Sequence, residues 1–124
     1  MRLLLASALL LATMGTVQAE QDVHWTSQDT HAAIDQVDPQ YRAWVDAIVR
    51  CESSYEPYAT APNDGGYGPS RGAVQINDYF QGAHFRAQGF ADPYNPYEAV
   101  AYLAAALGGD YVTDGIGWWR WSCA

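Results

Sequence analysis

The stretch CESSYEPYATAPNDGGYGPSRGAVQIN, residues 51–77, decides the fold of this chain. It opens at the end of an expected helix, passes through the strong turn signal Asn63-Asp64-Gly65-Gly66, and closes on Gly-Ala-Val-Gln-Ile-Asn. A carboxylate, Glu52, therefore lies at the end of an apolar stripe and is followed by a loop rich in glycine and amide groups. This pattern predicts a proton donor in a partly dry place, faced by groups able to hold a sugar.

The helix that leads into this stretch is expected over residues 39–53 or one residue further. Asp38 can cap it, and apolar residues recur in it at helical spacing. Trp44, Ile48 and Glu52 are four residues apart and share one face, so we expect Trp44 in the core and Glu52 on the buried stripe. Burial and the negative end of the helix both raise the pKa of Glu52, as a general acid near neutral pH requires.

Three further helices are expected outside this region. A short one over residues 30–37 lies in a polar N-terminal segment, and another covers residues 78–87. The third begins at Asn95-Pro96, a cap followed by proline, and stops at Gly108-Gly109. The aromatic tail, residues 115–123, is expected to pack back on the domain. The fold class is therefore mainly α with some β (α+β), with at most a small β-hairpin.

The first residues have the pattern of a secretory signal peptide, residues 1–19. An apolar run over residues 3–12 is followed by the small-residue exit Val17-Gln18-Ala19, and the run is too short to span a bilayer comfortably as a membrane anchor. We expect the mature chain to be secreted or periplasmic, or associated with a cell wall, and to have no membrane span. Residues 20–37 are expected to lie loosely on one domain, residues 38–124.

The composition indicates a small globular domain that carries a net negative charge. Hydrophobic residues make up 49% of the 124 residues, and six basic residues, all arginine, stand against fourteen acidic ones. Such a balance argues against nucleic acid as a partner, and it predicts a protein that stays soluble as a monomer. His24, His31 and His84 show no ligand spacing, so neither a metal nor another cofactor is expected.

The two cysteines, Cys51 and Cys123, are expected to form a disulfide, because an even count in an exported protein favours one. The bridge would tie the end of the Glu52 helix to the C-terminus. Metal ligation and a reactive thiol are the alternatives, and neither has support, since two thiols without a spaced histidine make a poor zinc site.

Several short motifs resemble the lysozyme-like superfamily. Cys51-Glu52-Ser53-Ser54 followed by Gly72-Ala73-Val74-Gln75-Ile76-Asn77 is similar to small bacterial lysozyme-like domains and to soluble lytic transglycosylases. The stretch from Asp92-Pro93 to Ala101-Tyr102-Leu103 is similar to the helix that follows in the transglycosylases. The resemblance covers roughly residues 38–123. It implies a lysozyme-like fold, with helices around a substrate groove.

The resemblance also implies an activity on peptidoglycan glycan strands. It makes Glu52 the catalytic acid that protonates the β-1,4 bond between N-acetylmuramic acid and N-acetylglucosamine. The substrate-binding candidates are polar and aromatic side chains beyond the turn: Ser70, Gln75, Asn77, Tyr79, Trp118 and Trp119.

The chain departs from the family's pattern where animal-type lysozymes carry a second carboxylate. Residues 67–71 contain no acid, Ser70 stands where one would be, and the spacing of Asp64 is not the family's. A single-carboxylate scheme is therefore expected, in which the substrate's acetamido group or 6-hydroxyl intercepts the cation. The 6-hydroxyl route gives the anhydro product of a lytic transglycosylase. We lean slightly to it over hydrolysis, although the tail lacks the Tyr-Asn-Ala-Gly segment of those enzymes.

Three alternatives remain open from the sequence, and one of them is a small secreted structural or interaction protein built on the same scaffold. Glu52 could be a structural member of an ion pair with Arg71 or Arg120. The domain could also be a non-catalytic peptidoglycan- or chitin-binding module on the same fold, which would have no need of an acid at Glu52.

Overall fold

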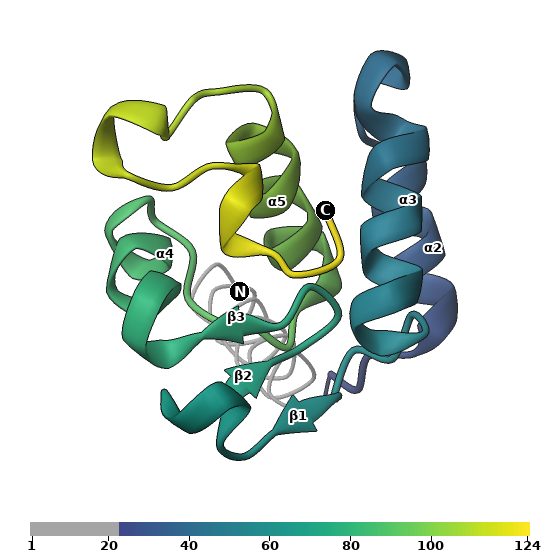
Figure 1. Ribbon diagram of the computed structural model, residues 1–124. Helices are drawn as coiled ribbons and strands as arrows, with labels where there is room; N and C mark the ends of the chain where they lie inside the picture. The colour runs from purple at the N-terminus through teal and green to yellow at the C-terminus, as the bar shows by residue number, and fades with distance from the viewer. Residues whose placement is uncertain (1–22) are drawn as a thin grey trace, which may run out of the picture.

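The computed structural model describes residues 23–124, so the expected signal peptide lies outside the described residues. This part of the chain is mainly helical and carries a small antiparallel sheet, in agreement with the expected fold class. Helices α2 (Ser27–Asp35) and α3 (Pro39–Ser53) lie side by side, and α5 (Pro96–Leu107) packs against both. The C-terminal segment, yellow in Figure 1, runs back across the molecule from α5 toward α3.

Helix α3 forms where the sequence predicted it. The Asp38 side chain accepts a hydrogen bond from the backbone of Gln40 at 3.1 Å, and Val45, Ile48 and Val49 are fully buried. The expectation that Trp44 belongs to the core is wrong, because its side chain is 39% exposed. The buried stripe of α3 passes through the neighbouring Val45, and a step of one residue turns a side chain by about 100° around the helix.

Helix α2 is longer than predicted, and it is not loosely attached. It begins at Ser27, after a cap in which the Thr26 backbone N–H donates to the Asp29 carboxylate at 2.9 Å. Ala33 and Ile34 are buried against α5. The expectation of a loose segment is therefore wrong for this helix, which supplies part of the hydrophobic core.

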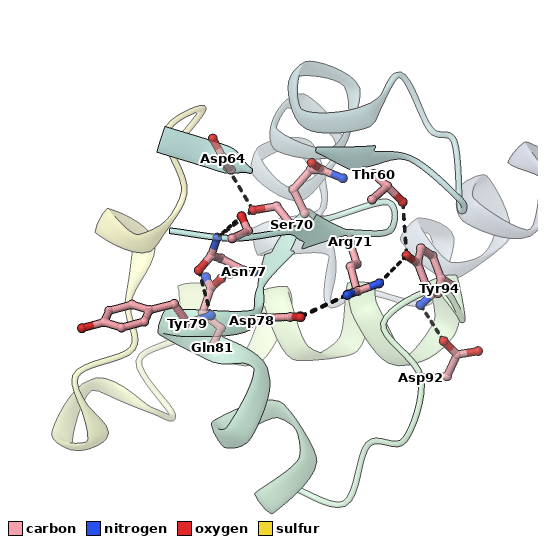
Figure 2. Close-up of polar contacts among 12 residues, drawn as sticks. Thr60, Asp64, Ser70, Arg71, Asn77, Asp78, Tyr79, Gln81, Asp92 and Tyr94 are labelled. Carbon is pink, nitrogen blue, oxygen red and sulfur yellow. Dashed lines mark hydrogen bonds and ion pairs between the residues drawn. The ribbon is translucent and has the colours of Figure 1, made fainter. Parts of the chain in front are cut away.

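The sheet has one strand more than the expected hairpin. Strands β1 (Thr60–Ala61), β2 (Ser70–Arg71) and β3 (Ile76–Asn77) pair in that order, all antiparallel. A short turn connects β2 to β3, so that β2 pairs with β1 on one side and with β3 on the other. Within this turn Gln75 has a positive φ of 53°. Arg71, the second residue of β2, forms an ion pair with Asp78 at 3.1 Å (Figure 2).

The predicted helix over residues 78–87 is present in two parts. A π-helical turn, Asp78–Gly82, precedes helix α4, Ala83–Ala87. The Asn77 side chain caps the π-helical turn by accepting hydrogen bonds from the backbones of Tyr79 and Phe80, at 3.0 and 3.2 Å. The sheet is thus joined directly to the next helix through one residue.

The C-terminal tail is fixed at two points. The predicted disulfide between Cys51 and Cys123 is present. Two residues before it, Trp121 is buried, and its indole N–H donates to the Val74 carbonyl at 2.8 Å. Within residues 23–124, no helix combines the length and the apolar character that crossing a membrane requires.

Candidate active site

A cavity of about 190 Å³ opens between the end of α3, the sheet and the C-terminal tail. It is lined by residues from four separate segments of the chain: Glu52, Asp64, Gly65, Tyr67, Ser70, Gln75, Asn77, Phe80, Arg120, Trp121 and Ser122. Four of the predicted site residues therefore meet in one place, namely Glu52, Ser70, Gln75 and Asn77. Tyr79 and Trp118 do not line this cavity.

Glu52 is half-buried at the base of α3, and the tail holds one of its oxygens. Its Oε1 accepts hydrogen bonds from the backbone N–H of Cys123 at 3.2 Å and from the Ser122 hydroxyl at 3.4 Å. Burial raises the pKa of Glu52 above its ordinary value, these two hydrogen bonds oppose the change, and the charge of Asp64 adds to it. The predicted direction of the pKa shift is confirmed, with burial as its main cause.

Glu52 is not a member of an ion pair within residues 23–124. Arg71 is engaged with Asp78 at 3.1 Å on the outer side of β2, and its guanidinium also donates to the Tyr94 hydroxyl. Arg120 donates through Nε to the carbonyl of Gly115. The alternative reading of Glu52 as a structural ion-pair partner is therefore not supported.

Asp64 gives the cavity a second carboxylate besides Glu52, whereas the expected single-carboxylate scheme stays a prediction. The Ser70 hydroxyl donates to Asp64 at 2.9 Å, and the Asn77 amide donates to the Ser70 hydroxyl at 3.1 Å (Figure 2). Ser70 and Asn77 are both buried. They form a short chain of hydrogen bonds that orients the Asp64 side chain. The Asn63–Gly66 turn signal marked this loop in the sequence, but not its direction toward Glu52.

The amide side chains of Gln75 and Asn77 make hydrogen bonds within the protein that the sequence did not predict. Gln75 donates through Nε2 to the carbonyls of Ala59 and Gly72, at 3.0 and 2.9 Å. Asn77 uses its carbonyl oxygen as a cap and its amide N–H groups within the sheet region. Both residues line the cavity, and their substrate-binding role stays a prediction.

Two exposed aromatic side chains form an aromatic rim of the cavity lining, and the two predicted ones, Tyr79 and Trp118, lie outside it. Tyr67 and Phe80 line the cavity, and their ring centroids are 4.8 Å apart. Tyr79 is 72% exposed, its ring contacts that of Tyr67, and it points away from the polar cluster in Figure 2. Trp118 contacts the neighbouring Trp119 and lies outside the lining. The rim residues Tyr67 and Phe80 were missed in the sequence because single exposed aromatics carry no pattern.

The described residues contain no group of three or more histidine, cysteine, aspartate or glutamate side chains that could hold a metal ion. His84 is engaged in the fold, with its two ring nitrogens at 2.8 Å from the Tyr102 hydroxyl and 3.0 Å from Asp114.

Comparison of the chain with protein-family models, with curated proteins and with solved structures finds no match. The lysozyme-like resemblance is therefore carried by the short motifs alone.

Proposed function

We propose that this chain is a secreted peptidoglycan-cleaving enzyme, of the muramidase or lytic transglycosylase type, with Glu52 as the general acid. The observation that carries the proposal is a half-buried glutamate with a raised pKa, in a cavity that it shares with an oriented aspartate. The bond cleaved is the β-1,4 bond between N-acetylmuramic acid and N-acetylglucosamine. The signal-peptide pattern and the disulfide favour export.

The mechanism starts with protonated Glu52. Its Oε1 is occupied by the tail, so Oε2 is the oxygen available to give a proton to the glycosidic oxygen as the bond to the anomeric carbon breaks. The positive charge that develops on the sugar ring is stabilised by the Asp64 carboxylate. Asp64 is suited to this because the Ser70 hydroxyl orients its carboxylate within the same cavity as Glu52.

Two routes complete the reaction, and they differ in the role of Asp64. In hydrolysis, Asp64 accepts a proton from a water that attacks the anomeric carbon, or bonds to that carbon itself before water releases it. In transglycosylation, the substrate's own 6-hydroxyl attacks the anomeric carbon and gives its proton to Glu52, which became a carboxylate in the first step, and the product carries a 1,6-anhydro ring. The first route requires a second carboxylate unless the substrate's acetamido group intercepts the cation in its place, and the second route requires none.

Replacement of the proposed acid tests the activity. Glu52→Gln keeps the size of the side chain and its acceptor oxygen, so purified cell-wall sacculi should still bind while the release of soluble muropeptides stops. Glu56→Gln is the matched control, since Glu56 is an exposed glutamate nearby that does not line the cavity. If wild-type protein binds sacculi but releases no muropeptides, the chain is a binding module and the enzyme proposal is wrong.

Mass spectrometry of the released fragments assigns the route. Reducing ends that disappear in Asp64→Asn indicate hydrolysis with two carboxylates. Anhydro ends that persist in Asp64→Asn indicate the single-carboxylate transglycosylase route.

A further inference from the structure

Arg120 is the one cationic side chain that lines the cavity among the described residues. It is the last residue of the final 3-10 turn, Trp118–Arg120, and its side chain makes contacts on two sides. Nε donates to the Gly115 carbonyl at 3.1 Å, and the guanidinium carbon lies 5.0 Å from the centre of the Phe80 ring. The aromatic face and the carbonyl together keep the guanidinium at the mouth of the pocket.

The guanidinium has no carboxylate partner in residues 23–124. The ion pairs there are Arg71 with Asp78 and His84 with Asp114. The two terminal nitrogens of Arg120 donate to no acceptor in that part of the chain, although acidic residues outnumber basic ones in the sequence by fourteen to six. An arginine that is oriented but unpaired, at the mouth of a pocket, is available to a ligand.

We propose that Arg120 is a specificity residue that binds a carboxylate carried by the muramyl residue of the substrate. The inference rests on the proposed function. A guanidinium presents two parallel N–H groups that match the two oxygens of a carboxylate. N-acetylmuramic acid carries such a group on its 3-O side arm, either as the free lactyl carboxylate or on the attached peptide, and N-acetylglucosamine does not. Arg120 therefore selects peptidoglycan strands over neutral chitin.

The overall charge of the chain makes this local contact important. With a formal net charge of −8, the chain does not attract a polyanionic wall over long distances. Arg120 lines the same cavity as the two carboxylates and offers an anionic ligand a cation at close range. The Gly115 carbonyl and the Phe80 ring orient its guanidinium.

Binding is measured in the Glu52→Gln background, so that the test does not depend on turnover. The three probes are glycan chains freed of peptide by an amidase, glycan chains that keep their peptides, and chitin oligosaccharides of similar length. Changing Arg120→Gln should weaken binding of the carboxylate-bearing glycans by about 5- to 10-fold, and that of chitin by less than about twofold. Arg120→Lys keeps the positive charge but loses the two parallel N–H groups, so its affinity for these glycans should lie between that of Arg120 and that of Arg120→Gln.

Arg50→Gln is the matched control, because Arg50 is exposed on α3 and does not line the cavity. Loss of affinity for peptide-free glycans alone assigns the contact to the lactyl carboxylate, and loss for peptide-bearing glycans alone assigns it to the peptide. Equal losses for chitin and for the carboxylate-bearing probes would overturn the inference, as would a failure of these probes to bind. A protein that shows this selectivity yet releases no muropeptides would keep the inference and lose the proposed catalysis.

Discussion

Burial and hydrogen bonding act on the Glu52 carboxyl in opposite directions. Burial favours the protonated form, and the N–H of Cys123 and the hydroxyl of Ser122 favour the charged form. Burial has the larger effect, and the negative charge of Asp64 adds to it. The Glu52 carboxyl is therefore held in place by hydrogen bonds from the tail and not by a cation of the described residues, and its pKa is raised above the ordinary value.

This balance predicts how the stability of the protein depends on pH. Because the folded pKa of Glu52 lies above its ordinary value of 4.5, the folded state keeps a proton that the unfolded chain releases. Stability therefore decreases as pH rises from the unfolded pKa through the folded pKa, and the loss is complete above the folded one. Glu52→Gln removes this loss, so its unfolding temperature should exceed that of the wild type at pH 7 and match it at pH 3.

Thermal unfolding followed by circular dichroism checks this prediction. Glu56→Gln reports the general effect of removing one negative charge from the same region. If Glu52→Gln is less stable than the wild type at pH 7, or if its unfolding temperature differs from the wild type by the same amount at pH 3 and pH 7, burial does not dominate the pKa of this carboxyl.

The backbone just after Glu52 adopts a left-handed conformation that the sequence did not predict. Ser54 and Tyr55 follow α3 with positive φ angles of 52° and 67°, where glycine is the usual residue. Tyr55 is held there by its hydroxyl bond to Asp46 at 3.2 Å and by contact with the ring of His31. Distant contacts maintain this conformation, and local propensity does not predict it.

At the scale of elements, the turn between β2 and β3 fits closely against the segment that leads into α5. Gly72 has a φ of 82°, and a Cβ there would run into the carbonyl of Pro93. Its own N–H donates to the Ala59 carbonyl at 2.7 Å. The position therefore permits only glycine, on both conformational and steric grounds.

Gly72→Ala should destabilise the protein by about 3 kcal/mol or more, since left-handed strain and a backbone clash add together. Gly66→Ala is the matched control, because Gly66 has a φ of 85° but nothing lies within 4 Å of its added Cβ. We expect the control to lose only about 1–2 kcal/mol. Urea unfolding of the two variants measures the difference, and equal losses would mean that the Pro93 segment moves aside.

Some elements could be predicted because their signals are local. Helices α3 and α5 follow a capping residue with proline at the first position, and their apolar spacing is regular. Strand β3 and the π-helical turn could not be predicted in this way. Two-residue strands are too short to show alternation, and the π-helical turn depends on the Asn77 cap.

Helix α2 and Trp44 illustrate the opposite difficulty. The N-terminal segment is polar on average, and its few apolar side chains, Ala33 and Ile34 among them, form no clear stripe in the sequence. They are buried because α2 packs against α5. Trp44 is a residue type that is often buried, but it lies one position before Val45, which belongs to the buried stripe of α3. In both cases the tertiary partner decides burial.

At the scale of the whole molecule, the candidate site depends on contacts between distant parts of the chain. Glu52 could be predicted from helical phase and motif, and the disulfide from the cysteine count. That Ser122 and Cys123 donate to Glu52 from about 70 residues away could not be predicted, because no local pattern records it. Asp64 was considered as a second acid and set aside because of its spacing, and Arg120 was considered only as an ion-pair partner of Glu52, so neither was predicted to line the pocket.

The tail that completes the pocket is held by both the disulfide and Trp121, and the two act on different states. The disulfide closes a loop across a sequence separation of 72, which mainly restricts the unfolded chain. Trp121 acts on the folded state, through its buried ring and its 2.8 Å hydrogen bond to Val74. It lies only two residues from Cys123, so it can keep the tail in place without the bridge.

The double variant Cys51→Ala/Cys123→Ala should therefore lose about 4 kcal/mol of stability, measured by urea unfolding. Below its transition it should keep the near-ultraviolet circular dichroism of the wild type, since Trp121 still anchors the tail. Trp121→Ala should lose about 3–5 kcal/mol, and it should lose that spectrum in the folded state although the disulfide is intact. If the double variant loses the spectrum and Trp121→Ala keeps it, the disulfide itself positions the donors of Glu52, and the pocket would then form only under oxidising conditions.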